Sequence, residues 1–357
     1  MKKNFLWLNV VERLKKDIVE KNFNSGDIFY TIRQICNKYR VSTITAQRAF
    51  SELEREGWIR KYPGRGTVVL KNNLPVEIKV FLPEIVHPVI DSKYIFSEIL
   101  SGLSEAVQET NSKLVKFTKP YFFLNGFEKN NCFIIFQEFE ELNTDKTYAV
   151  FKNGKNYSVV VHAYSENKMC SSVGIDFKKG FFSATKHLIS LGHRRIGFVS
   201  DMICNPWYTA RFEGYLKALR RSGIRFDWKL VKETNENPAL NYKAMDEFFM
   251  LEEPPTAIVA GNDMRALYII EYCQKHNIRI PSDLSLIGFD NIPEGAFSNP
   301  PLTTMDTRLK EIGKIAVYLV LDLFSGKKKS NENILISPQL VLRESTTRNK
   351  EKKKINS

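Results

Sequence analysis

The strongest constraint on the fold is a regular alternation of apolar strands with amphipathic helices, which begins at Glu77 and runs through most of the chain. Strands are predicted at 77–83, 132–136, 157–161, 196–200, 257–261 and 285–289, and helices at 95–109, 180–191, 211–223 and 264–276. Such alternation predicts parallel sheets with helices on both faces. The length of the region predicts two such units rather than one. Residues 125–156, rich in Asn, Lys and Glu around two short strands, support no functional prediction.

The first seventy residues carry a different pattern. Apolar side chains recur every four residues from Leu6 to Ile18, which predicts a helix ending near Asn22, and residues 25–27 form a turn. Thr31 can cap a helix that runs through Tyr39. Ser42 can cap a second helix that runs through Glu56, where Gly57 supplies the left-handed stop. Two short helices joined by residues 40–42 make a helix-turn-helix.

A β-hairpin is predicted directly after this helix pair. Residues 58–62 and 67–70 have strand character, and residues 63–66 form the tight turn between them. Arg65 lies between Gly64 and Gly66 at the tip. Because its neighbours carry no bulk, the guanidinium can enter a narrow minor groove, which attracts arginine. The hairpin is therefore predicted to be the wing of a winged helix.

The net charge of +13 is concentrated near the two ends of the chain. Residues 1–71 hold 15 Lys and Arg against 7 Asp and Glu, and residues 348–357 hold 5 against 1. A local basic excess of this kind is typical of nucleic-acid binding. We therefore expect the N-terminal segment to contact double-stranded DNA and the long middle region to have a different role.

Several classes of protein are disfavoured by composition. The five cysteines, an odd number with no C-x-x-C spacing, argue against a disulfide framework and a zinc site. The apolar run near the N-terminus is broken at Asn9 and again at residues 12–13, which is too early for a signal peptide. No stretch approaches the roughly 18 apolar residues of a membrane span. We expect a cytoplasmic protein with reduced cysteines, no membrane attachment, no metal and no cofactor.

Short motifs recur along the whole N-terminal segment. They are SGD at 25–27, IR at 32–33, VS at 41–42, Thr45, AF at 49–50, LEREG at 53–57, Ile59 and GRGT at 64–67. This set resembles the GntR family of winged-helix regulators, which implies an α+β winged helix-turn-helix over residues 1–72. By position, the resemblance implies that DNA is faced by Arg33, Ser42, Thr43, Thr45, Arg65 and Gly66.

The chemistry of these residues agrees with that implication. Arginine can read guanine through two hydrogen bonds, and hydroxyls at a helix N-terminus suit phosphate or base edges. Members of the family often carry arginines where this chain has Thr43 and Gln47, so the operator sequence of relatives does not transfer; Gln47 can read adenine. As alternatives, Arg33 and Arg65 are solvated surface arginines and Ser42 is purely a helix cap. Cys36 and Phe50 are assigned to the small core.

A second set of motifs covers the longer region. It comprises GID at 174–176, HLISLGHRRIGF at 187–198, ARFEGY at 210–215, PTAIVAGND at 255–263, IPSDLSLIGFD at 280–290, PPLTT at 300–304 and LVLREST at 340–346. The set resembles the effector domain of LacI-type repressors, which is similar to periplasmic sugar-binding proteins. The resemblance implies a two-lobed α/β domain over residues 77–347, with a ligand between the lobes. The remaining residues, 348–357, are predicted to be a disordered basic tail.

The resemblance implies that Arg211, Asn262 and Asp290 make most polar contacts with the ligand. An arginine donates to adjacent hydroxyls, an aspartate accepts from two, and an amide does either. It also aligns Tyr242 with an aromatic that packs on a sugar face. From the first lobe the resemblance implies His162 as a contact, because it follows the strand Val159 to Val161, where relatives place a polar contact.

Each of these assignments has an alternative. Arg211 and Asp290 are a structural ion pair, Tyr242 is a helix-surface tyrosine, and His162 is a structural histidine. Asp263 is expected to cap the helix that begins at Met264. His187 and His193 are expected to be helix and turn residues rather than metal ligands, because the sequence shows no third ligand.

Three functions compete for this layout. The favoured one is a ligand-responsive, homodimeric DNA-binding regulator, expected to act as a repressor, that resembles the arabinose-responsive type of repressor, with a monosaccharide as effector. The same architecture with a purine or sugar-phosphate effector is the alternative, and a soluble sugar-binding protein is another. An enzyme is disfavoured because the sequence lacks G-x-S-x-G, a Walker loop, a metal cluster and a Rossmann glycine triplet.

Overall fold

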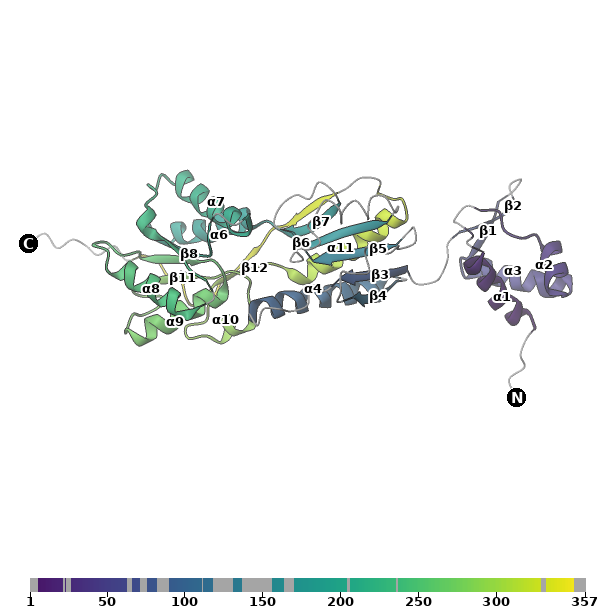
Figure 1. Cartoon of the computed structure of the whole chain (residues 1–357), viewed down its shortest axis with the longest axis horizontal. Coiled ribbons are helices and arrows are strands. Elements are labelled where there is room, and N and C mark those ends of the chain that lie inside the picture. Colours follow the sequence, from purple (N-terminus) through teal and green to yellow (C-terminus); the bar gives the residue numbers. More distant parts are fainter. Residues whose placement is uncertain are drawn as a thin grey trace, which may run out of the picture. The chain divides into compact units, whose positions relative to one another are not determined.

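A computed structural model gives the helices and strands of each part of the chain (Figure 1). The structure describes residues 6–21, 23, 27–62, 66–70, 76–81, 90–110, 112–117, 131–136, 156–163, 170–203, 206–235, 237–328 and 332–349. Contacts divide the chain into two compact units, residues 1–77 with 110–113 and residues 78–109 with 114–357. Each unit is described by itself.

The N-terminal unit contains three helices and a hairpin. Its elements are α1 (Leu6–Glu20), α2 (Ile32–Tyr39), α3 (Thr43–Arg55), β1 (Ile59–Tyr62) and β2 (Gly66–Val69), with β1 and β2 antiparallel. Thr31 caps α2 in a capping box with Gln34, and Ser42 caps α3. Gly57 has a φ of 78°, which suits glycine because it carries no Cβ. The predicted helix-turn-helix and hairpin are therefore confirmed.

The core of this unit forms where the apolar face of α1 meets α3. Val10, Leu14 and Ile18 are buried on α1, in agreement with their four-residue spacing. Phe50 is buried on α3, and Cys36 is partly buried against the same cluster. Because this small core contains mostly aliphatic and aromatic side chains from every element, it can hold the helix pair and the hairpin in one fixed arrangement.

The first lobe of the larger unit is a six-stranded sheet in the order β13-β7-β6-β5-β3-β4. Its strands are β3 (Val76–Phe81), β4 (Ser112–Phe117), β5 (Cys132–Phe136), β6 (Tyr157–Ala163), β7 (Ser171–Ile175) and β13 (Asn333–Ile336). Neighbouring strands from β13 to β3 run parallel. The strands β5 and β7 are buried along their whole length, as expected for a parallel sheet covered on both faces.

Two helices of this lobe, α4 (Ile90–Glu109) and α11 (Leu309–Phe324), pack against each other. A glycine on each makes this possible. A Cβ at Gly102 would overlap the backbone carbonyl of Lys310, and a Cβ at Gly313 would overlap that of Ile99. The backbones of α4 and α11 therefore lie too close for any side chain at these two positions.

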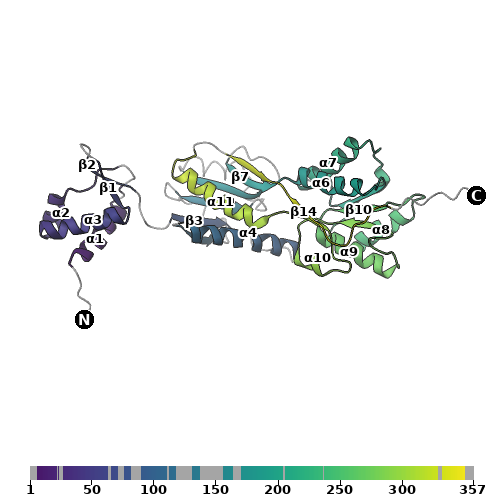
Figure 2. The ribbon, with the colours of Figure 1, turned by 180° about the vertical axis from the view of Figure 1, so that it is seen from behind.

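The second lobe is a four-stranded parallel sheet in the order β11-β10-β8-β9. Its strands are β8 (Ile196–Ser200), β9 (Val231–Glu233), β10 (Ala257–Ala260) and β11 (Ser285–Ile287). Its helices are α6 (Phe177–Ser190), α7 (Pro206–Arg221), α8 (Pro238–Phe249), α9 (Asp263–Lys275) and α10 (Pro293–Phe297). Figure 2 shows α6 and α7 on one side of this sheet and α8 and α9 on the other. This arrangement confirms the predicted α/β architecture.

The chain passes between the two lobes three times. It leaves the first lobe between β7 and α6, returns between β12 (Thr304–Asp306) and α11, and leaves again between β13 and β14 (Gln339–Val341). The strands β12 and β14 pair antiparallel at this junction. Helices α8 and α11 were not predicted from the sequence. Strands β5 and β8 have the bounds that were predicted for them.

The C-terminal boundary differs slightly from the prediction. Asn349 donates its backbone N–H to the carbonyl of Leu191 at 2.8 Å, so packing continues two residues past 347. The rest of the predicted tail, 350–357, lies outside the described residues. Among the helices that the structure describes, none is long and apolar enough to cross a membrane.

Candidate DNA interface and effector site

The exposed face of α3 is the candidate DNA-reading surface. Ala46, Ala49 and Phe50 are buried in the core, and this places Thr43 and Gln47 on the opposite, exposed side. Arg33 is exposed on α2. These positions agree with the three predicted contacts, which remain predictions in the absence of DNA.

The hydroxyls of Ser42 and Thr45 interact with each other. Ser42 Oγ accepts from the backbone N–H of Thr45 at 3.3 Å and lies 2.9 Å from Thr45 Oγ1. Ser42 therefore caps α3. The two interpretations of this residue were a DNA contact and a pure helix cap, and one hydroxyl can serve both roles. Both hydroxyls keep free lone pairs or protons because each has one donor and two acceptor positions. A role in contacting DNA stays a prediction for both.

Two further residues on this face were missed by the sequence analysis. Ile44 is 67% exposed, and Arg48 is exposed one turn later. The helical register counted from the Ser42 cap would have found them, because positions 43, 44, 47 and 48 share a face. An exposed isoleucine can contact a thymine methyl and an arginine can contact guanine or phosphate.

The wing is only partly described. Strands β1 and β2 pair from Ile59 with Val69 to Tyr62 with Gly66, and Gly66 has a φ of 90°. The tip residues 63–65 lie outside the described residues, so the predicted contact of Arg65 has no structural account. Gly66 itself stands at the start of β2, next to the tip, as predicted.

In the larger unit, Arg211 on α7 is buried among aromatic rings. Its guanidinium carbon lies 4.5 Å from the ring centre of Phe177 and 4.9 Å from that of Tyr208. Nη1 donates to the carbonyl of Gly261 at 2.7 Å, while the buried Nε has no hydrogen-bond partner. Burial lowers the pKa of Arg211, and the charge of Asp290 partly opposes this. A buried cation with an unused donor suits a hydroxyl-bearing ligand.

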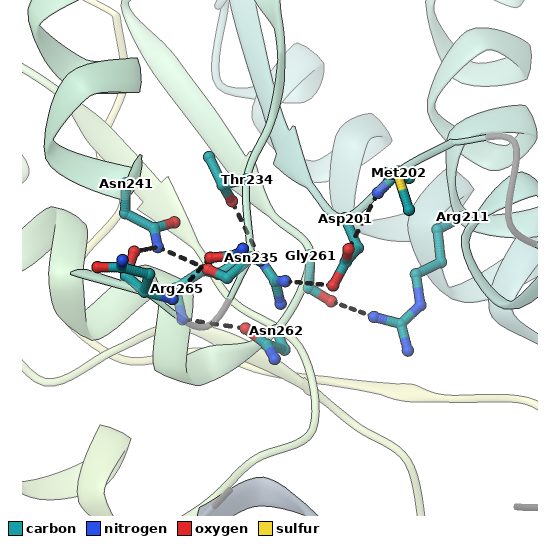
Figure 3. A network of polar contacts seen from close by, with 10 residues as sticks. Asp201, Met202, Arg211, Thr234, Asn235, Asn241, Gly261, Asn262 and Arg265 are labelled. Atoms are coloured by element: carbon teal, nitrogen blue, oxygen red, sulfur yellow. Dashed lines mark hydrogen bonds and ion pairs between the residues drawn. The ribbon is translucent and has the colours of Figure 1, made fainter. Parts of the chain in front are cut away.

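Beside Arg211, a polar network joins the carboxyl ends of three strands (Figure 3). Asn262 follows β10, and its side chain accepts from the backbone N–H of Arg265 at 3.0 Å. Arg265 is 1% exposed and forms an ion pair with Asp201, which follows β8, at 2.7 Å. Its Nε donates to Thr234, after β9, at 3.2 Å. The network therefore fixes the backbone that presents Asn262.

The helix cap at this point is different from the one expected. Asn262 is the N-cap of α9, and Asp263 is the first residue of the helix, so the expectation that Asp263 caps it is wrong. Asp263 instead accepts from the hydroxyl of Thr304 at 2.6 Å and the backbone N–H of Ile292 at 2.9 Å. Burial raises the pKa of Asp263 to about 7. This carboxyl ties α9 to β12 and to the loop after Asp290.

Asp290 lies at the same end of the sheet, just past β11. It is 6% exposed, has a φ of 110°, and donates its backbone N–H to Met305 O at 2.9 Å. The negative charge of Asp290 raises the pKa of Arg211 against the effect of burial. Arg211 Nη1 donates to the carbonyl of Gly261, the residue before Asn262. The structure thus brings Arg211, Asn262 and Asp290 together, where open α/β sheets place their ligands.

Tyr242 lies elsewhere. Its hydroxyl accepts from Lys275 Nζ at 3.3 Å, and its ring packs against Tyr272 at 6.0 Å between centres. Lys275 ends α9, whose 13 residues separate it from Asn262 by roughly 20 Å. This position does not fit the expected contact with a ligand and agrees with a helix-surface tyrosine. Its neighbour Asn241 belongs to the polar network instead.

His162 is placed at a β-bulge near the carboxyl end of β6. The register between β6 and β7 shifts between Val161 and Ala163, and His162 has a φ of 57°. A bulge redirects one side chain, and bulges are frequent next to binding sites. The side chain of His162 is 7% exposed. Its predicted contact with a ligand stays a prediction.

The buried network includes residues that the sequence analysis did not name. Asp201, Arg265 and Asn241 are spaced far apart in the sequence, and their types occur at many exposed positions. One signal was available: Arg265 falls on the face of α9 that must be buried, where an arginine needs a partner. The partner itself, Asp201, follows only from the parallel pairing of β8 with β10.

His187 and His193 each have hydrogen-bonding neighbours in the C-terminal segment. His187 lies on α6 and is 3.2 Å from the hydroxyl of Thr346. His193 is 2.9 Å from Thr256 Oγ1 and 3.0 Å from the carbonyl of Thr347. Burial lowers the pKa of both. Within the described part of the chain, no group of three His, Cys, Asp or Glu side chains could hold a metal ion.

Comparisons with known proteins agree with this two-part structure. Residues 6–69 match the gntR family of bacterial regulatory proteins, and residues 185–346 match the periplasmic binding protein-like domain. The chain is 29% identical over 321 residues to the HTH-type transcriptional repressor CytR of Escherichia coli K12, covering 88% of this chain and 91% of the relative.

Two further similarities span one or both parts. The arabinose metabolism transcriptional repressor of Geobacillus stearothermophilus is 26% identical over 366 residues, covering 95% of this chain and 97% of the relative. A crystal structure of a LacI family transcriptional regulator from Enterococcus faecium with bound ribose covers 77% of this chain and 100% of its own, with a TM-score of 0.63 and 25% identity. The chain is therefore a bacterial regulatory protein that joins a GntR-family DNA-binding domain to a periplasmic binding protein-like effector domain of the LacI type.

Proposed function

We propose that this protein is a homodimeric transcriptional repressor whose binding to operator DNA is controlled by an uncharged monosaccharide. Arg211, Asn262 and Asp290 make the main polar contacts with this sugar. The single observation that carries the proposal is the buried Arg211 beside Asn262 and Asp290, in a chain whose other unit is a winged helix. Such a role places the protein in the cytoplasm, with its DNA.

The charges near Arg211 favour an uncharged effector. The pKa of Arg211 is shifted by the charges of Arg265, Asp201 and Asp290. Together with Arg211, the site therefore holds two cations and two carboxylates. A phosphate would add negative charge beside both carboxylates in a buried setting, which is costly unless a cation compensates it. A neutral sugar needs only donors and acceptors, and these residues supply both. We therefore rank a sugar phosphate below a monosaccharide.

The similar proteins point the same way. Two of them are named as repressors, one of arabinose metabolism, and a third was solved with ribose. The dimer is supported by size, because one winged helix buries too little surface for useful operator specificity. DNA contacts are assigned to Arg33, Ser42, Thr43, Thr45, Gln47, Arg65 and Gly66, and we add Ile44 and Arg48.

A thermal-shift screen of the full chain tests the effector class. The panel contains L-arabinose, D-ribose and other neutral monosaccharides, purines, and the phosphates of the same sugars. A ligand that binds only the native state stabilises it by RT ln(1 + [L]/Kd), about 2.7 kcal/mol at one hundred times Kd. We expect a neutral monosaccharide to raise the Tm of the parent but not of Asp290→Ala. A rise with sugar phosphates alone would overturn the proposed class.

A further inference from the structure

Asn291, the residue after Asp290, is hydrogen-bonded to residues near two of the segments that connect the lobes and to helix α4. Arg343 Nη2 donates to Asn291 Oδ1 at 2.7 Å, and Asn291 Nδ2 donates to Asp306 Oδ2 at 3.3 Å. The carbonyl of Asn291 accepts from the hydroxyl of Tyr94 at 3.2 Å. One asparagine thus has three partners on three separate elements.

Two of these partners lie at the segments that connect the lobes, and the third lies on a helix of the first lobe. Asp306 ends β12, from which the chain enters α11 of the first lobe, and Arg343 follows β14, by which it returns. Tyr94 lies on α4, so its bond to Asn291 joins the first lobe directly to the loop of Asp290. A change in lobe angle must therefore alter at least one bond of Asn291.

The chemistry of the partners requires an amide at this position. Arginine only donates, so it must face Oδ1, while a carboxylate only accepts, so Asp306 must face Nδ2. An aspartate at 291 would keep the bond to Arg343 and set two carboxylates against each other. The φ of Asn291 is 59°, which asparagine and glycine tolerate better than other residues.

Tyr94 is suited to its bond because it stays neutral. Burial raises its pKa to about 12, and the charges of Glu98, Asp306, Asp290 and Asp263 add to the effect. The same carboxylates show that the phenol reaches the loop between the lobes. The neutral hydroxyl is therefore the donor in this bond.

We propose that Asn291 is a positioning residue that couples occupancy of Asp290 to the angle between the lobes. Asp290 and Asn291 are consecutive and both have positive φ values, 110° and 59°, so a displacement of one backbone also displaces the other. A ligand that pulls on Asp290 then shifts the bonds to Tyr94, Asp306 and Arg343 together. The inference rests on the proposed function in taking a change in DNA binding as the output.

Hydrogen exchange of the full chain without any ligand tests the coupling at its source. Asn291→Gly keeps the positive φ and removes both side-chain bonds, while Tyr94→Phe removes only the bond from α4. Loss of one such bond should raise exchange about fivefold in β12, in β14 and in the loop after Asp290. Tyr318→Phe is the matched control, since that hydroxyl bonds Glu109 within the first lobe.

The double variant separates coupling from simple loosening. If the side chain of Asn291 holds its carbonyl toward Tyr94, Tyr94→Phe should add little exchange in the Asn291→Gly background. If the two substitutions acted independently, their increases in exchange rate would multiply in the double variant. That result would overturn the proposal. Equal exchange in Asn291→Gly, Tyr318→Phe and the parent would overturn it as well.

A second arm reads the output on DNA. Full-length parent and variants are titrated with L-arabinose on a DNA fragment that the parent selects from a random library. Asn291→Gly should bind this DNA within about twofold of the parent and show at least a fivefold shift in the L-arabinose midpoint. If the parent itself selects no DNA or ignores L-arabinose, the proposed function fails, whereas the ligand-free exchange result still decides the role of Asn291.

Discussion

The burial of the ion pair between Asp201 and Arg265 predicts how much stability the protein loses when the pair is broken. Arg265 is 1% exposed and Asp201 has a side-chain exposure of 22%, at a distance of 2.7 Å. Asp201→Asn keeps the shape of the side chain and leaves the guanidinium without its carboxylate. Removing one partner of a buried pair costs roughly 3 kcal/mol or more, because the remaining charge is uncompensated.

That cost is large enough to measure by thermal unfolding. For a domain of this size, 1 kcal/mol lowers the Tm by about 2 °C, so Asp201→Asn should lower it by about 6 °C. Differential scanning calorimetry on the full chain resolves such a shift. The transition of the larger unit is the one to follow.

Two further variants make the reasoning refutable. Asp283→Asn breaks an exposed ion pair with Arg279, whose side-chain exposures are 39% and 76%, and should leave the Tm nearly unchanged. The double variant Asp201→Asn with Arg265→Met removes the buried charge and should recover most of the loss. If Asp201→Asn costs no more than Asp283→Asn, or the double variant is no better than Asp201→Asn alone, the account of this network is wrong.

Four other outcomes follow from the structure. Arg33→Ala should weaken binding to selected DNA by roughly 1–3 kcal/mol at constant salt without changing the Tm, as measured by fluorescence anisotropy. A fragment of residues 1–71 should bind the same DNA much more weakly than the full chain, and sedimentation should show the full chain as a dimer. Gly102→Ala should lower the Tm of the larger unit by several degrees, because its Cβ would overlap the carbonyl of Lys310. Burial raises the pKa of Asp263 from 3.8 to about 7, so the native state binds a proton that the unfolded state releases, and stability falls as the pH rises through that range. The Tm of Asp263→Asn, relative to the parent, should therefore be higher at pH 8 than at pH 5.

Most of the fold could be predicted because it depends on local patterns. The four-residue spacing of Leu14 and Ile18, the caps Thr31 and Ser42, and apolar strands such as β5 are each visible within a short window of sequence. The strand and helix alternation then fixes a parallel sheet. Helix α11 was missed although a local pattern was available, because its buried residues Leu309, Ile312, Ala316 and Val320 recur at helical spacing.

The effector site could be predicted only in part. Arg211, Asn262 and Asp290 were found through a family resemblance, and the structure brings them to one end of the second sheet. Their supports were not found, because the pairing of Arg265 with Asp201 and of Asn291 with Arg343 joins residues more than fifty positions apart. Tyr242 was named from its position in an alignment with relatives. Such an alignment does not fix the direction in which a side chain on α8 points.

The central claim is that a ligand held by Arg211 and Asp290 controls DNA binding by a separate unit. Fluorescence anisotropy of the selected DNA fragment, titrated with the stabilising monosaccharide, tests it most directly on the parent, Asp290→Ala and Arg211→Ala. The account predicts that all three bind the DNA with similar affinity, and that the sugar changes the affinity of the parent alone. Variants that respond at the parent's midpoint would contradict the claim and leave Arg211 and Asp290 as structural residues.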